Sequence, residues 1–429
     1  IAAAATGFGE SRRMPSHERA GILSRTAELL GANAVELAEL MARESGKPIR
    51  YCKAEVARAV VTFGLGADQA RTLGGEVMPI DLEARAEGRL CYYTRVPRGP
   101  VAAISPFNFP LNLIAHKLSP AIAVGTTTVL KPPPQCPVTG HRLAELLAEA
   151  GLPASMLSVL HCRPDVAQRM VEDDRMKVLS FTGSDVVGWR LKTLARNKQV
   201  LLELGGNAPC VVDETVAVDD VVDRIMTGAW ANAGQVCIKV QRVLVHRSSY
   251  DEFLETFVER SSAVRCGDPL DPETVVGPVI DSTHVERILS WIDEARRGGA
   301  TVHCGGTADG NVVAPTVISG ADPSMRVYKD EVFGPVTIVE PVEDFDAALT
   351  ACNDTRFGLQ VGVFTRDISR GLRAVRELDY GGVIINDIPT FRVDNFPYGG
   401  MGDSGFGREG VRFAAEEMTE PKVAIWREL

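Results

Sequence analysis

Lys177-Val178-Leu179-Ser180-Phe181-Thr182-Gly183-Ser184 is the stretch of sequence that decides the fold. Its apolar run has the length of a buried strand, and the small residues after it mark a turn into a helix. Similar apolar runs precede it at 99–105, 124–130 and 157–160, and a helical pattern occupies 139–150. Strands that alternate with helices predict a parallel, doubly wound α/β sheet.

A second series of the same kind follows along the chain. Its apolar runs predict a second α/β domain and lie at 209–212, 243–245, 336–339 and 382–386. A chain of 429 residues is long enough for two or three domains. Residues 16–46 are expected to form two helices, because apolar residues recur there every three or four positions. The segments 90–96 and 421–426 are strand-like but isolated.

The composition, with 45% hydrophobic and 24% charged residues, is typical of a soluble globular enzyme. A net charge of −10 argues against nucleic acid as a partner, and no apolar run approaches the roughly 20 residues of a membrane span. The start of the chain lacks the basic residues of a signal peptide.

Neither histidines nor cysteines have metal-ligand spacing, so no metal is expected. Nine dispersed cysteines without a Cys-x-x-Cys pair predict a reducing compartment, the cytoplasm: Cys52, Cys91, Cys136, Cys162, Cys210, Cys237, Cys266, Cys304 and Cys352.

Cys237 and Glu203 offer a thiol nucleophile and a carboxylate base. Only a small fraction of a free thiol is ionised near pH 7, so a reactive cysteine needs a base or a positive neighbourhood. A glutamate in a partly apolar site has a raised pKa and exchanges protons near neutrality. For an arbitrary pair, a buried structural cysteine and a solvated glutamate are the simpler interpretation. The residues around this pair favour chemistry instead.

The neighbours of both side chains resemble the paired signature of the aldehyde dehydrogenase superfamily. They are Leu202-Glu203-Leu204-Gly205-Gly206 and Gly234-Gln235-Val236-Cys237. The resemblance covers nearly the whole chain, because further blocks agree in the family's order: Pro106-Phe107-Asn108-Phe109-Pro110, Lys131-Pro132, Phe181-Thr182-Gly183-Ser184, Glu331-Val332-Phe333-Gly334-Pro335, and Pro397-Tyr398-Gly399-Gly400 with Ser404-Gly405.

This resemblance implies a Rossmann-like dinucleotide-binding domain, a catalytic domain and a small β oligomerisation element. We expect the first over residues 1–78 and 98–205, and the second over 206–409. The third is expected over 79–97 and 410–429. In the family, strand-like segments such as 90–96 and 421–426 pair as an oligomerisation sheet. A homodimer or homotetramer is therefore expected.

The resemblance also implies a mechanism. Cys237 attacks the aldehyde carbon, hydride leaves to NAD(P)+, and water hydrolyses the resulting thioester with Glu203 as its base. Asn108, with the backbone N–H of Cys237, is the expected donor to the oxyanion. As an isolated asparagine between two prolines, Asn108 would equally suit a loop cap.

For the cofactor, the resemblance implies that Gly183 and Ser184 hold the pyrophosphate at the start of a helix. It further implies that Lys131 binds the adenosine ribose, that Glu331 binds the nicotinamide ribose and that Phe333 packs on the ring. Each of these residues has a simpler role when taken alone: a solvated lysine, a surface acid or a core aromatic residue.

Two positions depart from the family's pattern. Phe107, counted with the cofactor-binding residues, stands where tryptophan is common, so packing is kept and the indole donor is lost. Pro134 stands where members that prefer NAD often carry a glutamate, which binds the ribose 2′-hydroxyl and repels a 2′-phosphate. NADP is therefore not excluded, and NAD is only slightly favoured.

Val236 and Ile238 are expected to line the substrate pocket, and both are apolar. Arg392 is a candidate for binding an anionic tail of the substrate, although an ion pair with a neighbouring acid is its favoured role. The blocks 391–394 and 405–410 resemble family members that oxidise lactaldehyde, glyceraldehyde 3-phosphate or succinate semialdehyde. A small aldehyde is therefore the expected substrate.

Two other functions remain open for the same residues. A cofactor-independent cysteine thioesterase or esterase needs only Cys237, Glu203 and Asn108, and a non-catalytic scaffold needs none of them. The ribose and pyrophosphate contacts expected at Lys131 and Ser184 argue against a hydrolase, and the complete catalytic set argues against a scaffold. The sequence predicts an NAD(P)-dependent aldehyde dehydrogenase.

Overall fold

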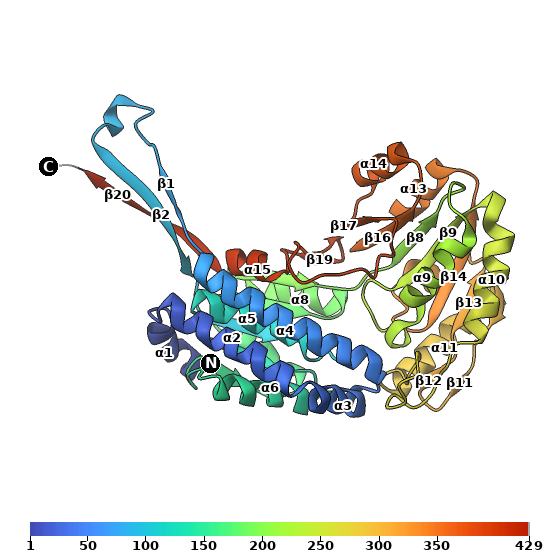
Figure 1. The fold of residues 1–429 in the computed structure, drawn as a ribbon, viewed down its shortest axis with the longest axis horizontal. Helices are drawn as coiled ribbons and strands as arrows, with labels where there is room; N and C mark the ends of the chain where they lie inside the picture. The colour runs from blue at the N-terminus through green and yellow to red at the C-terminus, as the bar shows by residue number, and fades with distance from the viewer. Residues whose placement is uncertain (428–429) are drawn as a thin grey trace.

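The computed structural model describes residues 1–427, and two large sheets organise the chain (Figure 1). The first sheet is built from β3 (Val101–Ile104), β4 (Thr128–Lys131), β5 (Leu157–Val159), β6 (Val178–Thr182), β7 (Gln199–Glu203) and β19 (Gly405–Phe406). Its strand order is β19-β7-β6-β3-β4-β5. Five strands run parallel, as predicted, and the short β19 is antiparallel at one edge.

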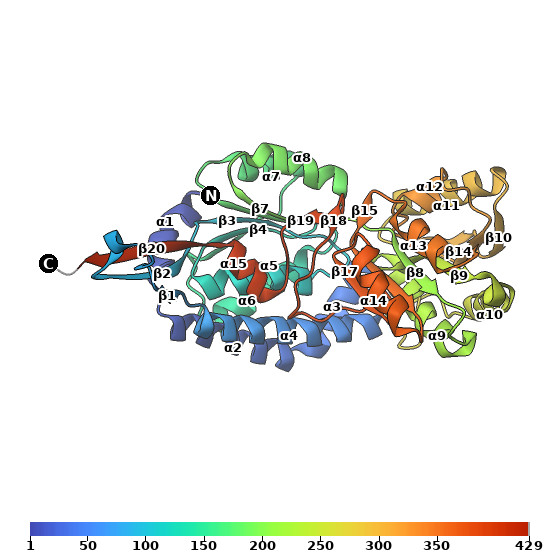
Figure 2. The same ribbon diagram turned by 90° about the horizontal axis from the view of Figure 1, so that it is seen from above.

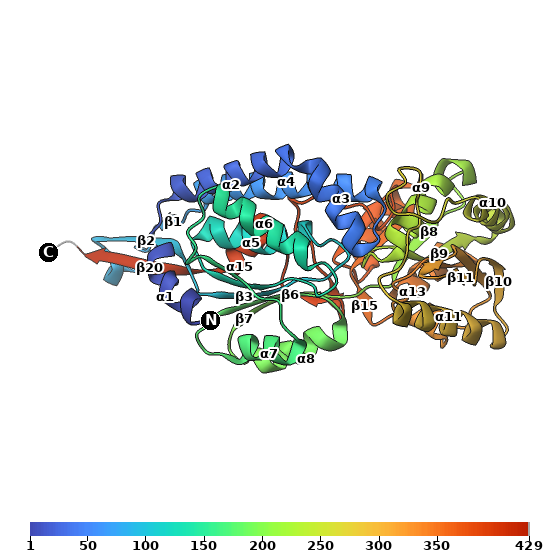
Figure 3. The same cartoon turned by 90° about the horizontal axis from the view of Figure 1, so that it is seen from below.

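Helices cover both faces of this sheet (Figures 2 and 3). Val101 and Ala103 of β3 belong to the core under one helical layer, whereas Ala102 and Ile104 belong to the core under the other. This alternation is what a strand buried on both faces requires. The first layer holds α2 (Ser16–Ala32), α3 (Ala34–Ser45), α4 (Ile49–Thr72), α5 (Asn112–Val124), α6 (Pro137–Glu149) and α15 (Val411–Glu417), and the second holds α1 (Ala2–Ser11), α7 (Pro164–Glu172) and α8 (Asp185–Ala195).

One predicted strand is partly wrong. The apolar run 124–130 was expected to form a single strand, but Val124 is the last residue of α5 and the strand begins only at Thr128. Gly125, at φ 78°, ends the helix in the left-handed conformation that glycine adopts without steric cost. Every residue of α5 is buried, so the helix has no exposed polar face and shows no amphipathic periodicity that separates it from a strand.

The second sheet has seven strands in the order β10-β13-β14-β9-β8-β16-β17. Only β10, at one edge, pairs antiparallel, and the others run parallel. The strands are β8 (Ala208–Val212), β9 (Val240–His246), β10 (Thr301–Cys304), β13 (Thr316–Ser319), β14 (Val336–Val342), β16 (Gln360–Phe364) and β17 (Gly382–Ile385). The helices around them are α9 (Val218–Trp230), α10 (Tyr250–Ser262), α11 (Ser282–Arg297), α12 (Arg326–Lys329), α13 (Phe345–Asn353) and α14 (Ile368–Glu377).

A third, three-stranded sheet projects from the first half of the molecule as an arm (Figure 1). It consists of β1 (Glu76–Met78), β2 (Arg89–Pro97) and β20 (Thr419–Arg427), all antiparallel. The two isolated strand-like segments of the sequence therefore pair with each other along their whole length. The domain boundaries themselves remain a prediction.

Several short elements connect these units. They are η1 (Ala84–Ala86), η2 (Ala231–Gly234), η3 (Arg247–Ser249), β11 (Ala308–Asp309), β12 (Val312–Val313), β15 (Phe357–Gly358) and β18 (Met401–Gly402). In the part of the chain that the structure describes, no helix combines the length and apolar character needed to cross a membrane.

Candidate active site

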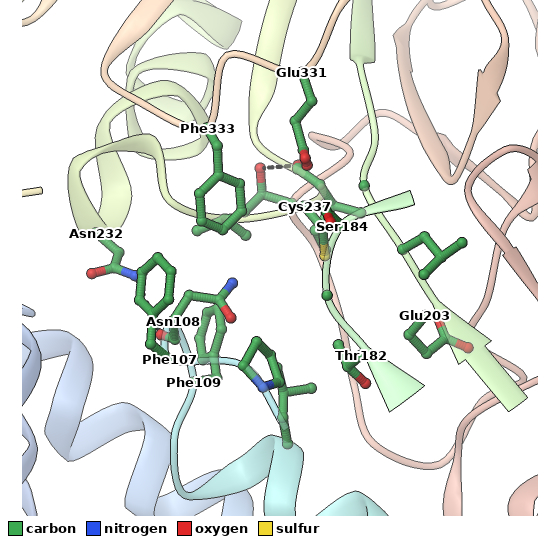
Figure 4. A pocket seen from close by; sticks show the side chains of 18 of the residues that line it. Phe107, Asn108, Phe109, Thr182, Ser184, Glu203, Asn232, Cys237, Glu331 and Phe333 are labelled. Atoms are coloured by element: carbon green, nitrogen blue, oxygen red, sulfur yellow. Dashed lines mark hydrogen bonds between the residues drawn. The ribbon is translucent and has the colours of Figure 1, made fainter. Parts of the chain in front are cut away.

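A cavity of about 570 Å³ is lined by residues from both large sheets. The first sheet contributes the ends of β6 and β7, and the second contributes the loops that precede β9 and β14. Figure 4 shows Cys237, Glu203, Asn108 and Glu331 around it. The cavity brings together every predicted site residue except Lys131: Cys237, Glu203, Asn108, Gly183, Ser184, Glu331, Phe333, Phe107, Val236, Ile238 and Arg392. Lys131, at the end of β4, is not among its lining residues.

A strained turn delivers Cys237 to the cavity. Asn232, Ala233 and Gly234 are consecutive residues with φ of 53°, 53° and 69°. Such left-handed conformations cost free energy in residues other than glycine and are frequent at active sites. A Cβ on Gly234 would lie 2.1 Å from the backbone oxygen of Gly334, so this position admits only glycine. The turn lies between α9 and β9, and it is held from both sides by strand and helix.

The Cys237 thiol lies in an apolar setting. Its neighbours Val236 and Ile238 are buried and line the cavity with it. Sγ lies 3.1 Å from the hydroxyl of Tyr398. Burial raises the pKa of Cys237 to about 11, and the hydrogen bond with Tyr398 and the charge of Arg392 oppose that rise.

Asn108 is buried in the loop that follows β3, and its orientation is fixed. Its Nδ2 donates to the backbone oxygen of Gln235 at 3.0 Å. Its own backbone oxygen accepts from Nζ of Lys47 at 3.2 Å and from Nδ2 of Asn232 at 3.3 Å. An amide nitrogen has two N–H groups, so one remains for another acceptor.

Glu203 ends β7 and is only 4% exposed. Neither carboxylate oxygen has a hydrogen-bond partner, which is unusual for a buried acid. Burial, reinforced by the nearby charge of Glu409, raises its pKa well above the ordinary value, while Arg392 and Lys117 oppose the rise. The carboxylate is therefore suited to take up a proton near neutral pH.

Glu331 and Phe333 come from the loop before β14. Oε1 of Glu331 accepts from the backbone N–H of Gly206 at 3.0 Å, and burial raises the pKa of Glu331 to about 7. Phe333 has φ 46°, a strained conformation for this residue type. Its ring meets that of Phe107 edge to face, with centroids 5.9 Å apart.

Comparison with known proteins identifies the class to which this site belongs. The model of the aldehyde dehydrogenase family matches residues 1–424. The chain belongs to the aldehyde dehydrogenase family. One relative, a 3-sulfolactaldehyde dehydrogenase of Priestia megaterium, is 38% identical over 410 residues, which cover 95% of this chain and 86% of the relative.

Two solved structures of the family are similar over almost the whole chain. Aldehyde dehydrogenase 21 of Physcomitrella patens, in complex with succinate, has a TM-score of 0.97 and 39% identity and covers 99% of this chain and 89% of its own. The glyceraldehyde-3-phosphate dehydrogenase GapN of Methanocaldococcus jannaschii, complexed with NADP, has a TM-score of 0.96 and 35% identity, with coverage of 100% and 93%. The predicted fold class is thus confirmed, and the enzyme is an NAD(P)-dependent aldehyde dehydrogenase. The hydrolase and scaffold alternatives are not favoured.

The cavity of this aldehyde dehydrogenase fits a nicotinamide cofactor. Gly183 and Ser184 lie at the cavity wall directly before α8, an eleven-residue helix whose N-terminal N–H groups attract a pyrophosphate. Gly183 packs so closely on the ring of Phe181 that a Cβ would lie 2.6 Å from it. This position therefore admits only glycine, and Ser184 beside it is exposed at the cavity wall. Glu331 and Phe333 line the same cavity from the opposite sheet.

A buried charge cluster supports the catalytic groups, and sequence analysis missed most of it. Lys117 of α5 donates to Oγ1 of Thr182 at 2.7 Å, and its Nζ lies 3.5 Å from Oε1 of Glu409. Arg392 pairs with Oε2 of Glu409 at 3.0 Å, which is the ion pair that the sequence favoured for it. A lysine within the largely apolar segment 112–124 was the available signal, because a buried cation needs a partner.

The cluster continues through a second carboxylate. Asp394 accepts hydrogen bonds from both Nε and Nη2 of Arg58, at 3.1 and 2.6 Å, and lies 2.8 Å from Nε2 of His116. Although burial opposes it, hydrogen bonding with His116 and Arg58 lowers the pKa of Asp394 below its usual range. Arg58 and Arg392 both line the cavity, so its charged wall is built on ion pairs.

Proposed function

We propose that the enzyme oxidises a small aldehyde to the carboxylic acid with Cys237 as the nucleophile. The observation that carries this proposal is the convergence of Cys237, Asn108 and Glu203 on one cavity that also contains Ser184 and Glu331. The first three residues suit acyl chemistry, and the last two suit a dinucleotide. A hydrolase has no use for the second set.

In the first half of the reaction, the Cys237 sulfur forms a bond to the aldehyde carbon. The second N–H of the Asn108 amide and the backbone N–H of Cys237 stabilise the oxygen that becomes negative. A bound nicotinamide would supply the acceptor for the hydride on this carbon, whose loss leaves a thioester on the sulfur. Glu331 and Phe333 would hold the cofactor from the second sheet.

In the second half, Glu203 takes a proton from water as the water oxygen attacks the thioester carbon. The C–S bond breaks, the acid leaves and the Cys237 thiolate is restored. The raised pKa of Glu203 and the lack of any partner for its oxygens support this role. The acids of the charge cluster are less suited, because Arg392 and Arg58 hold Glu409 and Asp394 in ion pairs.

For the substrate, we propose a small aldehyde with an anionic group at its far end. Arg58, Lys47 and Arg392 are basic residues of the cavity wall near Phe109 and Tyr398. Lys47 is paired with Glu55, whereas Nε of Arg392 has no partner. The relatives support this class, since one acts on 3-sulfolactaldehyde and another holds succinate. The apolar Val236 and Ile238 fit the short carbon chain between the two ends.

For the cofactor, we propose that the enzyme accepts both NAD and NADP, with NAD slightly preferred. The M. jannaschii relative holds NADP. Pro134 is exposed directly after β4, where an acid would repel a 2′-phosphate. Burial lowers the pKa of Lys131, the last residue of the same strand.

We further propose that the enzyme is a homodimer or homotetramer whose subunits meet through the arm. β20 forms one edge of the arm and exposes Val423, Ile425 and Trp426. β17 forms the free edge of the second sheet, and α14, which follows β16, exposes Ile368 and Leu372. When a second copy covers this surface, unpaired strand edges gain hydrogen-bond partners and exposed apolar side chains are removed from water.

One assay tests the catalytic proposal. Purified enzyme is given NAD or NADP and a panel of small aldehydes, with and without a carboxylate or sulfonate, and nicotinamide reduction is followed at 340 nm. We expect turnover with both nucleotides, faster with the anionic aldehydes, and a loss of at least about 10³-fold in Cys237→Ala. Cys266→Ala, at an exposed cysteine outside the cavity, is the matched control and should keep full activity. Full activity of Cys237→Ala would remove this thiol from the reaction.

A further inference from the structure

The catalytic roles above leave Tyr398 without a function, although its hydroxyl lies 3.1 Å from the Cys237 sulfur. Tyr398 is 2% exposed. Its backbone is fixed by two hydrogen bonds with Glu409, one in each direction, at 3.0 and 2.7 Å. Its ring packs against that of Phe396, with centroids 6.2 Å apart. The hydroxyl is therefore held at the sulfur by both the main chain and the ring.

The protonation states of Tyr398 and Cys237 determine which of the two side chains donates the hydrogen bond. Burial, followed by the charge of Cys237, raises the pKa of Tyr398 well above its ordinary value, so the phenol keeps its proton. A thiolate can only accept a hydrogen bond. Once Cys237 is ionised, the O–H of Tyr398 is therefore the donor and the sulfur is the acceptor.

Arg392 also acts on this contact, because its guanidinium lies over the face of the Tyr398 ring. Its guanidinium carbon lies 3.7 Å from the centre of the Tyr398 ring. A cation at this distance is attracted by the ring, and its positive charge favours a negative charge on the nearby Cys237 sulfur. The charge of Arg392 accordingly acts to lower the pKa of Cys237.

The other groups that face the sulfur work against its ionisation. Burial has the largest effect, and the charges of Glu331 and Glu203 add to it. Only the Tyr398 hydrogen bond and Arg392 oppose them among the principal influences. A nucleophile between two carboxylates needs a local donor, and Tyr398 is the residue whose hydrogen bond reaches the sulfur.

We propose that Tyr398 is a further catalytic residue, whose hydroxyl donates a hydrogen bond to the Cys237 thiolate and holds the sulfur for attack on the aldehyde carbon. This inference rests on the proposed role of Cys237 as the nucleophile. The phenol keeps its proton throughout, and no bond to Tyr398 oxygen forms or breaks. The hydrogen bond weakens when sulfur loses its charge in the C–S bond, and it forms again when the thiolate leaves the thioester.

The test is a titration of the thiol without aldehyde or cofactor. The wild-type enzyme, Tyr398→Phe and Tyr380→Phe are alkylated with iodoacetamide across a range of pH. The modified peptide that contains Cys237 is quantified by mass spectrometry, because the chain has nine cysteines. Tyr380 is the matched control: it is buried, and its hydroxyl donates to the backbone oxygen of Cys352 at 2.6 Å, away from the cavity.

We expect the apparent pKa of Cys237 to rise by about one unit or more in Tyr398→Phe, since the variant loses a hydrogen bond to a charged group. At a fixed pH below that pKa, alkylation slows about tenfold for each unit. Tyr380→Phe should match the wild type. An unchanged profile in folded Tyr398→Phe would overturn the proposal.

A second variant keeps the test decisive if Tyr398→Phe does not fold. Replacing Tyr398 with 3-fluorotyrosine keeps the ring and the hydroxyl and makes the phenol a stronger donor, so the pKa of Cys237 should fall. An unchanged or higher thiol pKa would contradict the proposal. The titration needs no turnover, so its failure leaves aldehyde oxidation by Cys237 intact. Conversely, a wild-type enzyme without turnover would remove the proposed function and leave the titration interpretable.

Discussion

Burial affects Cys237 and Glu203, the two side chains proposed to react, in different ways. It raises the pKa of Glu203 and so makes this carboxylate a better proton acceptor at neutral pH. It also raises the pKa of Cys237, to about 11, and so keeps the thiol protonated and less reactive. The same apolar cavity thus improves the base and weakens the nucleophile. Local contacts to the sulfur therefore matter more than contacts to Glu203, whose oxygens have no partner.

The raised pKa of Glu203 predicts a pH dependence with a definite sign. Glu203 accepts a proton from water only as a carboxylate, so kcat should fall as the pH is lowered through its pKa. Burial has the largest effect on this pKa, and the charge of Glu409 has the second largest. The fall in kcat should therefore occur well above pH 4.5, the ordinary pKa of a glutamate. The measurement is kcat against pH for the wild type and for Glu76→Gln, an exposed control on β1. A kcat that stays constant down to the ordinary range of a glutamate would contradict the assignment.

At the residue scale, the motifs predicted candidate residues that the structure places at one cavity, whereas long-range contacts could not be predicted. Cys237, Glu203 and Asn108 lie in recognisable blocks, and all three line the cavity. Tyr398 also lies in such a block, but it is 161 positions from Cys237, and no local pattern reveals that their side chains touch. Asp394 is likewise 278 positions from His116. Such pairs depend on the packing of whole domains.

At the scale of elements, short apolar strands were predicted well and all-apolar segments poorly. β6 follows the predicted run closely because turn residues bound it on its C-terminal side. The boundary between α5 and β4 was misplaced because every residue of both elements is buried, so neither has an exposed polar face. The two-residue strand β19 has no periodicity of its own, and its pairing with β7 comes from tertiary structure.

The exposed apolar side chains of the arm strand β20 lead to a prediction about subunit association. Ile425 is 59% exposed on β20, and burying such a side chain typically contributes about 1.5–3 kcal/mol. We expect Ile425→Asp to weaken the subunit contact at least about tenfold, because the contact loses apolar surface and gains a charge without a designed partner. Val35→Asp, at an exposed position on α3, is the control.

Light scattering coupled to size-exclusion chromatography measures this effect across protein concentrations. The wild type and Val35→Asp should elute with a mass that is a multiple of the chain mass, and Ile425→Asp should dissociate at higher concentration. A wild-type protein that is monomeric throughout, or an Ile425→Asp variant that dissociates like the wild type, would refute the arm as the interface.

At the scale of the whole molecule, the site exists only because two sheets contribute to one cavity. Glu203 ends one strand of the first sheet and Ser184 follows another, whereas Cys237 and Glu331 precede strands of the second. The apolar runs predicted both sheets and the order of the motifs indicated the family, but each motif alone occupies a few residues. Their convergence depends on the relative position of the two halves, which local sequence patterns do not encode.

The most direct test of the account is to trap the acyl group on Cys237. Glu203→Gln is nearly isosteric and removes the base for water, so we expect the variant to form about one NADH per active site in a burst and then to stall. Mass spectrometry of the quenched protein should find the acyl mass on the peptide that contains Cys237. A variant that turns over at the full steady-state rate, with no acyl group on Cys237, would contradict the account.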